Sequence, residues 1–264
     1  MAEYFRFRPG DENPPGAIRA AVSLDALLQT EKPDQSYSQM MRSRLAGNAA
    51  RWCDDTYFLA SENGICVSRL WYGWGRHPDA VGNFGNFKTD PAFRGKGIGA
   101  TLLEHWFADL ANRSQGERPI ALFCTSAQSM IDRHYGKYGF RPAITPGCGG
   151  PTYCPLGDAP ETFAEFCEDY YRPGNNLRFV AGDIGWRHEI DCLLRFALMA
   201  ENKDFGLPSA QSYEEAWLHV RANPRCGKLE CILDAHGHAV GWAFTPQGRP
   251  REICLHSRYT TAMI

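Results

Sequence analysis

A glycine-rich loop in the first half of the chain has the composition of a phosphate-binding loop. It reads Arg94-Gly95-Lys96-Gly97-Ile98-Gly99-Ala100. Glycine lets the backbone approach a phosphate closely, and a helix start offers unpaired N–H groups to an anion. The loop lacks the Gly-Lys-Ser/Thr ending of a Walker loop, and its glycine spacing differs from the dinucleotide fingerprint. Alone it predicts an anion site at a helix start, with a tight turn that binds nothing as the alternative.

The elements around the loop fit such a site. A strand is predicted through Val81 to Thr89, directly before it. After it, apolar residues recur at helical spacing, which predicts an amphipathic helix. These residues are Leu102, Leu103, Trp106, Phe107 and Leu110.

The remaining elements of the first half follow from periodicity and turn residues. Asn63-Gly64 between two apolar runs predicts a β-hairpin, and the continuous apolar run 119–124 predicts a buried strand. Ser126 is predicted to cap a helix that ends at Gly139. The further predictions are a strand at 4–8, helix through 17–48 with a break at Pro33, a strand from Phe140, and a helix through 163–170 that ends at Pro173-Gly174.

A second motif follows the loop, Tyr135-Gly136-Lys137-Tyr138-Gly139-Phe140. Together with Thr89–Gly99 it resembles the two signature motifs of the GNAT superfamily of N-acetyltransferases, Q/R-x-x-G-x-G/A and Y-x-K/R-x-G-F. The resemblance covers residues 4 to 156. It implies an α/β (α+β) fold with a mixed, mostly antiparallel central sheet flanked by helices. It also implies transfer of an acetyl group from acetyl-CoA to a primary amine of a small molecule or peptide, by direct attack in a ternary complex.

The resemblance also assigns roles to residues. Those expected to hold the cofactor pyrophosphate are Arg94, Gly95, Lys96, Gly97, Ile98, Gly99 and Ala100. Backbone groups of Phe87, Lys88 and Thr89 would pair with the pantetheine arm, and an N–H near Phe87 would polarise the thioester carbonyl. This strand would splay from the 119–124 strand to admit the thioester.

Two further residues receive roles from the second half of the resemblance. Tyr135 would protonate the departing thiolate as a general acid. Gln128 stands where the family often has Asn, and its amide can make similar hydrogen bonds. Cys124 is a possible nucleophile, but an apolar strand would raise its pKa and make it inert.

The chain departs from the family pattern on the strand before the loop. Residues 81–88 contain no carboxylate, although many relatives have an acidic base there. An alkyl amine must lose a proton before it attacks. A water relay through Asn83 or Asn86, or help from His77 or Asp79, could supply the base. The alternative is an acyl-CoA-binding or sensing module without catalysis.

The last third of the chain repeats features of its beginning. Leu177–Asp183 aligns with Phe5–Asp11, and a second hairpin pattern surrounds Asp234–Gly237. We therefore predict three parts: 1–156 as a GNAT-like acetyltransferase domain, 157–174 as a connecting helix and linker, and 175–264 as a degenerate partial GNAT-like half without a CoA loop.

Composition narrows the class of protein further. A formal charge of −2 gives no global field for nucleic acid. The apolar runs are too short to span a membrane, and the N-terminus lacks the pattern of a secretory signal, so we expect a cytoplasmic protein. Ten scattered cysteines without a CxxC pair predict reduced thiols and no metal. The expected partners are an amine acceptor and acetyl-CoA, with a monomer or homodimer as the assembly.

Overall fold

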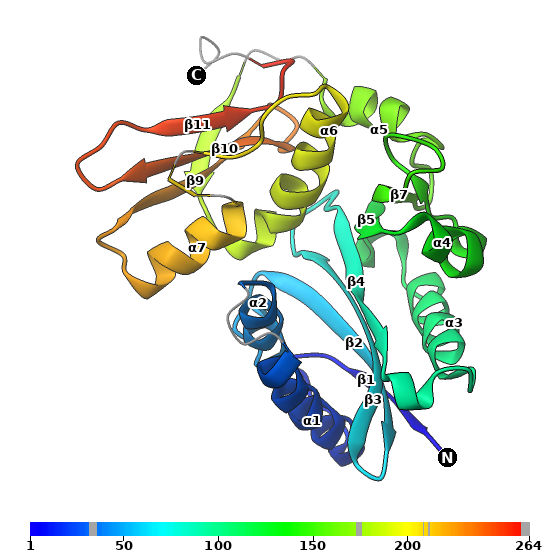
Figure 1. Ribbon diagram of the computed structural model, residues 1–264. Helices are drawn as coiled ribbons and strands as arrows, with labels where there is room; N and C mark the ends of the chain where they lie inside the picture. Colours follow the sequence, from blue (N-terminus) through cyan, green and yellow to red (C-terminus); the bar gives the residue numbers. More distant parts are fainter. Residues whose placement is uncertain (32–35, 173–175, 208, 211, 260–264) are drawn as a thin grey trace. The chain divides into compact units, whose positions relative to one another are not determined.

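The computed structural model describes residues 1–31, 36–172, 176–207, 209–210 and 212–259. Its chain divides into two compact units, each described here by itself (Figure 1). The first comprises Met1–Arg76 and Asn83–Arg118, and the second His77–Gly82 and Pro119–Ile264.

The first unit is a sheet with helices on both faces (Figure 1). Its strands lie in the order β1-β2-β3-β4, and the β1–β2 and β2–β3 pairs are antiparallel. The elements are β1 (Glu3–Phe7), α1 (Pro15–Glu31), α2 (Ser36–Leu45), β2 (Cys53–Glu62), β3 (Ile65–Gly75), β4 (Gly82–Thr89) and α3 (Ile98–Ala111). The predicted hairpin is confirmed, since Asn63 and Gly64 join β2 to β3 with positive φ angles of 52° and 78°.

Helices α1 and α2 cover one face of this sheet because their apolar residues recur at helical spacing. Leu24 and Leu28 of α1 and Met41 of α2 form a core with Tyr57 and Trp71, the side chains that β2 and β3 direct to this face. All five are at most 2% exposed. The Pro33 break predicted in this region lies outside the described residues.

Helix α3 covers the opposite face. The Trp106 ring lies 4.7 Å from the ring of Phe84 on β4 and 6.4 Å from that of Tyr72 on β3, centroid to centroid. Leu102, Leu103 and Leu110 are buried beside it, which confirms the predicted amphipathic helix. Phe107 belongs to the same predicted stripe but is 44% exposed.

The second unit contains the predicted buried strand, β5, which pairs antiparallel with β7. Its first elements are β5 (Ala121–Ser126), α4 (Gln128–Met130), β6 (Arg141–Pro142), β7 (Gly150–Pro155) and α5 (Phe163–Tyr170). A π-helical turn, Ile131–Tyr135, and a 3₁₀ turn, Gly136–Tyr138, continue α4. This helical segment ends as predicted at Gly139, whose φ is 95°.

The predicted cap at Ser126 is wrong. Ser126 is the last residue of β5, where it pairs with Gly150, and Ala127 occupies the N-cap position. The antiparallel ladder therefore continues one residue further than the capping pattern indicates. Helix α5 begins with a capping box between Thr162 and Glu165, and its predicted end at Pro173-Gly174 lies outside the described residues.

The second unit contains a further sheet with the strand order β8-β9-β10-β11. Its elements are β8 (Arg178–Ala181), α6 (Arg195–Ala200), α7 (Tyr213–Ala222), β9 (Gly227–Leu233), β10 (Ala239–Pro246) and β11 (Glu252–Leu255). A 3₁₀ turn, Ile184–Trp186, and a π-helical turn, Glu189–Leu194, precede α6. The second predicted hairpin is confirmed by the antiparallel β9–β10 pair.

The element order of this sheet parallels that of the first unit. A strand, helical segments, a hairpin and a further strand follow one another in both, and both sheets place these strands in chain order. The predicted fold class, mixed α and β with mostly antiparallel sheet flanked by helices, is confirmed. The three predicted domain boundaries remain a prediction.

Candidate functional site

The glycine loop joins β4 to α3 in a left-handed turn. Gly95 and Gly97 have φ angles of 76° and 78°, a region that residues with a side chain rarely adopt. Gly97 is the N-cap of α3, and the first hydrogen bond of the helix runs from the Thr101 N–H to the Gly97 carbonyl over 3.1 Å. The N–H groups before Thr101 therefore stand at the positive end of α3, where they favour an anion.

Side-chain contacts hold the approach to this turn. Asp90 accepts the Ala92 N–H at 2.8 Å and caps the short 3₁₀ helix Pro91–Phe93. Arg94 donates from Nε to the Thr89 carbonyl at 3.1 Å. Residues 94–97 are exposed, so a ligand in solution can reach both the glycines and the Arg94 and Lys96 cations.

The end of β4 packs directly on the start of α3. A Cβ atom on Gly99 would lie 3.0 Å from the Phe87 ring and 3.2 Å from the Thr89 hydroxyl oxygen, so any larger residue here would push the two elements apart. The structure thus brings Phe87, Lys88, Thr89 and residues 94–100 together in one continuous segment. Their individual binding roles remain predictions.

Strand β4 contains a bulge that the sequence did not reveal. Phe84 faces α3, and a side chain on Gly85 would face Trp71 on the opposite face. Asn86 then has a φ of 50°, and Phe87 again faces α3. One extra residue therefore interrupts the alternation of the strand. A left-handed residue with a side chain costs about 1 kcal/mol, and Asn tolerates it better than most residues.

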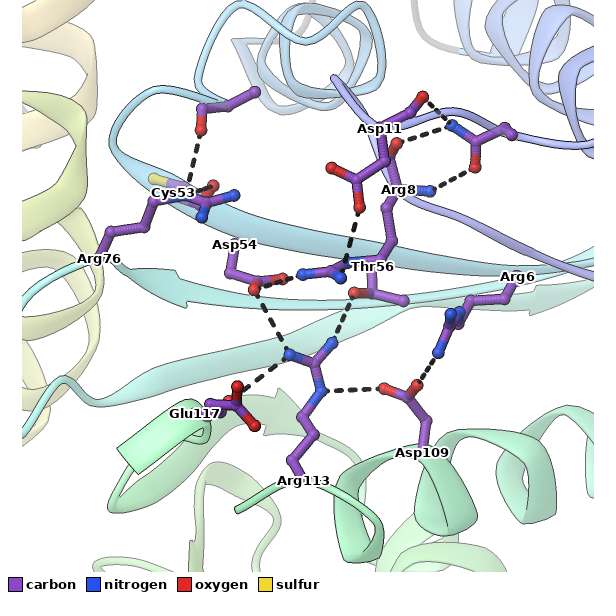
Figure 2. A network of polar contacts seen from close by, with 12 residues as sticks. Arg6, Arg8, Asp11, Cys53, Asp54, Thr56, Arg76, Asp109, Arg113 and Glu117 are labelled. Carbon is purple, nitrogen blue, oxygen red and sulfur yellow. Dashed lines mark hydrogen bonds and ion pairs between the residues drawn. The ribbon is translucent and has the colours of Figure 1, made fainter. Parts of the chain in front are cut away.

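A network of charged residues ties the C-terminal end of α3 to the sheet (Figure 2). Arg113 donates to Asp109 at 3.1 Å, to Asp54 of β2 at 3.4 Å and to the Thr56 hydroxyl at 3.3 Å. Asp109 also accepts from Arg6 of β1 at 2.6 Å. The helix that presents the loop is therefore fixed at its far end to β1 and β2 of the same sheet.

Burial makes this network strong. The side chains of Asp109 and Arg113 are 8% and 12% exposed, and the Tyr72 hydroxyl donates to Asp109. Burial would raise the pKa of the Asp109 carboxyl, but hydrogen bonds from Tyr72 and Arg6 and the charge of Arg113 hold it below its usual value. Removing one partner of a buried ion pair costs about 3–5 kcal/mol. The i,i+4 spacing of Asp109 and Arg113 was the sequence signal that could have found this pair.

Tyr135 lies in the second unit and is 6% exposed. Its ring packs on Phe140 with 5.7 Å between the centroids. Burial, followed by the neighbouring Cys124 sulfur, raises the pKa of the Tyr135 hydroxyl well above its usual value. The phenol therefore keeps its proton at neutral pH, which is the state a general acid requires.

Gln128 and Cys124 lie in the same unit. The Gln128 amide donates to Asp132 at 2.7 Å and accepts the Gly149 N–H at 3.3 Å, so it joins the helix start to the residue before β7. Its predicted contact with the cofactor remains a prediction. Burial raises the pKa of the Cys124 thiol well above its usual value, which agrees with an inert residue.

The predicted base candidates differ in their surroundings. The side-chain oxygen Oδ1 of Asn86 accepts from Arg69 Nε at 2.9 Å, and Asp79 is exposed. His77 stacks on Trp186 at 4.0 Å between centroids, and its Nε2 lies 3.4 Å from the buried Glu189 carboxylate. Burial opposes its charge, but Glu189 outweighs this and raises the pKa of His77 to about 9. His77 is therefore protonated at neutral pH and is unsuited to accept a proton.

Two general features complete the description. Within the described ranges, no three His, Cys, Asp or Glu side chains form a group that could hold a metal ion. None of the described helices has the length and apolar content to cross a membrane.

Comparison with known families identifies the segment that carries the loop. Residues 53–142 match the family model described as "Acetyltransferase (GNAT) domain". The matched part of the chain runs from β2 to β6, and the family is one of acyltransferases. A search of curated proteins gave no match.

Several solved structures are also similar to the chain. ElaA of Escherichia coli is 15% identical over 58% of this chain and 99% of its own, with a TM-score of 0.41. An acyl-CoA N-acyltransferase of Pseudomonas aeruginosa is 19% identical over 58% and 99%, with a TM-score of 0.39. The PaiA N-acetyltransferase of Thermoplasma acidophilum, solved in complex with coenzyme A, is 14% identical over 59% and 99%, with a TM-score of 0.38. At these values the likeness assigns no function to this chain.

The raised pKa of His77 predicts a loss of stability in alkali. The folded-state pKa of about 9 lies above the ordinary histidine value of 6.5, so the contribution is complete below about pH 6.5 and is lost as pH rises through about 9. We expect the free energy of unfolding, measured with urea, to fall over this range in the wild type and to fall less in His77→Gln. The exposed His219 of the same unit supplies the control, His219→Gln. Equal slopes in His77→Gln and the wild type would contradict the assigned ion pair.

Proposed function

We propose that this chain transfers an acetyl group from acetyl-CoA to a primary amine of a small molecule or peptide. The observation that carries the proposal is the connection from β4 to α3. It presents Gly95 and Gly97 in the left-handed conformation at an exposed helix start, flanked by two cations. The match of residues 53–142 to a GNAT acetyltransferase domain supports an acyl-CoA thioester as the phosphate-bearing ligand of this loop.

The proposed reaction is a direct attack in a ternary complex. The amine nitrogen bonds to the thioester carbonyl carbon, the carbon–sulfur bond breaks, and coenzyme A leaves as a thiolate. Tyr135 donates its phenolic proton to that sulfur and takes a proton back from solvent before the next turnover, while the proton lost by the amine passes to solvent through a group not yet assigned. An N–H at the β4 bulge, near Phe87, stabilises the oxyanion that forms in between. The role needs only backbone, which suits a strand without a carboxylate.

A second candidate is an acyl-CoA-binding module without catalysis. Two observations favour it: residues 82–89 carry no carboxylate, and the pKa of His77 is raised to about 9. The strand then offers no carboxylate base, and His77 is already protonated at neutral pH, so neither deprotonates an ammonium substrate. In this reading the glycine loop binds the same cofactor, but no acyl transfer follows.

Incubation with acetyl-CoA and a panel of primary amines separates the two candidates. The proposal predicts amine-dependent release of coenzyme A thiol and an acetylated product detected by mass spectrometry. Reactions without amine are the necessary control, because the chain has ten cysteines and Cys148 is exposed. Binding without turnover across the panel would favour the non-catalytic module. Absence of any binding would contradict both.

The Tyr135→Phe variant tests the general acid. The substitution keeps the ring packed on Phe140 but removes the proton donor. We therefore expect a fall in kcat of about 10²-fold. The dissociation constant of coenzyme A should stay within about twofold of the wild-type value, because the phosphates are held elsewhere.

Tyr138→Phe is the matched control for this substitution. Tyr138 belongs to the same motif but has no assigned role, and its variant should keep wild-type turnover. Unchanged kcat in Tyr135→Phe would remove Tyr135 from the mechanism while leaving the acetyl transfer itself in place.

A further inference from the structure

Three elements of the first unit meet at the β4 bulge through charged side chains. Arg69 of β3 donates from Nε to the side-chain amide oxygen of Asn86, Oδ1, at 2.9 Å. Its other two nitrogens donate to the two Glu31 oxygens, at 3.3 and 2.6 Å. Glu31 is the last residue of α1, so the contact joins a helix end, a central strand and the bulge.

The contact is largely shielded from water. Arg69 is 4% exposed, and the Glu31 side chain is 24% exposed. Lys88, on the far side of the bulge, donates to the same Glu31 carboxylate at 2.8 Å. Burial would raise the pKa of the Glu31 carboxyl, but hydrogen bonds from Arg69 and Lys88 hold it below its usual value. Glu31 therefore holds both sides of the bulge, one through Arg69 and one through Lys88.

The bulge decides where the end of β4 points. Because Asn86 is the extra residue, Phe87 turns toward Gly99 at the start of α3, and Lys88 turns toward Glu31. A different backbone at Asn86 would reverse both side chains and reorient the Phe87 N–H. The guanidinium of Arg69 fixes the side chain of Asn86 and, with it, the left-handed backbone that this arrangement requires.

We propose that the Glu31–Arg69 pair is a positioning device for acyl transfer, which acts by holding Asn86 and hence the N–H groups of the β4 bulge. This rests on the proposed acetyltransferase function. None of the three side chains reacts with substrate. Their contribution appears in the orientation of the thioester carbonyl during the chemical step, while cofactor affinity comes from the glycine loop. Loss of these contacts is therefore expected to lower kcat and to leave the KM for acetyl-CoA nearly unchanged.

Substitutions at Asn86 separate the hydrogen bond from the backbone shape. Asn86→Gly keeps access to positive φ but removes the acceptor for Arg69. Asn86→Asp keeps an oxygen acceptor and also tolerates the left-handed region. We expect kcat of the glycine variant to fall about tenfold or more, with KM for acetyl-CoA within about twofold, because small displacements of reacting groups have large kinetic costs. The aspartate variant should recover most of the lost kcat.

Asn63→Gly is the matched control. Asn63 has a φ of 52°, nearly the angle of Asn86, but lies in the β2–β3 turn. The same substitution there changes backbone entropy equally and should leave kcat within about twofold. Wild-type kcat in Asn86→Gly, or an equal loss in Asn86→Asp and Asn86→Gly, would overturn the positioning role while leaving the acetyltransferase function intact. Absence of acetyl transfer by the wild type would instead reject the proposed function, and the positioning role with it.

Discussion

The buried ion pair of Asp109 and Arg113 is the contact on which the first unit depends. A helix start binds an anion at a defined position only if the helix itself is fixed. Helix α3 begins after an exposed loop of four residues, 94–97. The restraint acts at the opposite end, where Arg113 bonds to α3 and β2 and Asp109 bonds to β1 and β3. Trp106 adds apolar packing between the two ends. The loop can therefore be rich in glycine and still keep a defined position relative to β4.

Local signals in the sequence predicted the elements of the site, and long-range contacts account for the rest. The glycine loop, the Asn63-Gly64 turn and the helix after the loop follow from residues close together in the chain. The β4 bulge does not, because its contacts come from Arg69 on β3 and, through Arg69, from Glu31 at the end of α1, which is separated from β4 by α2, β2 and β3. The His77–Glu189 pair is beyond sequence reasoning for the same reason, since its two residues lie in distant parts of the chain. Ser126 was predicted wrongly because a capping pattern says nothing about how far a ladder extends.

The C-terminal sheet gives the repeated sequence pattern a structural counterpart. Strands β8 to β11 follow the same order as β1 to β4, with helical segments after the first strand and a hairpin in the middle. We interpret residues 175–264 as a partial copy of the first half. Residues 175–264 contain no Gly-x-Gly-x-Gly run comparable to 95–99. Glu189, from this part of the chain, accepts the Val81 N–H at 2.8 Å immediately before β4. The last third of the chain thus contributes a contact at Val81, directly before β4.

Calorimetric titration with coenzyme A tests the central claim most directly, with the wild type compared to Gly97→Ala. The left-handed Gly97 has open space around a built Cβ, so alanine strains the backbone without a clash. Gly116→Ala, also in open space, is the matched control. The account predicts one coenzyme A per chain, with affinity about fivefold weaker or more in Gly97→Ala, from about 1 kcal/mol of strain, and unchanged in Gly116→Ala. No binding by the wild type, two sites per chain, or equal affinity in Gly97→Ala would contradict it.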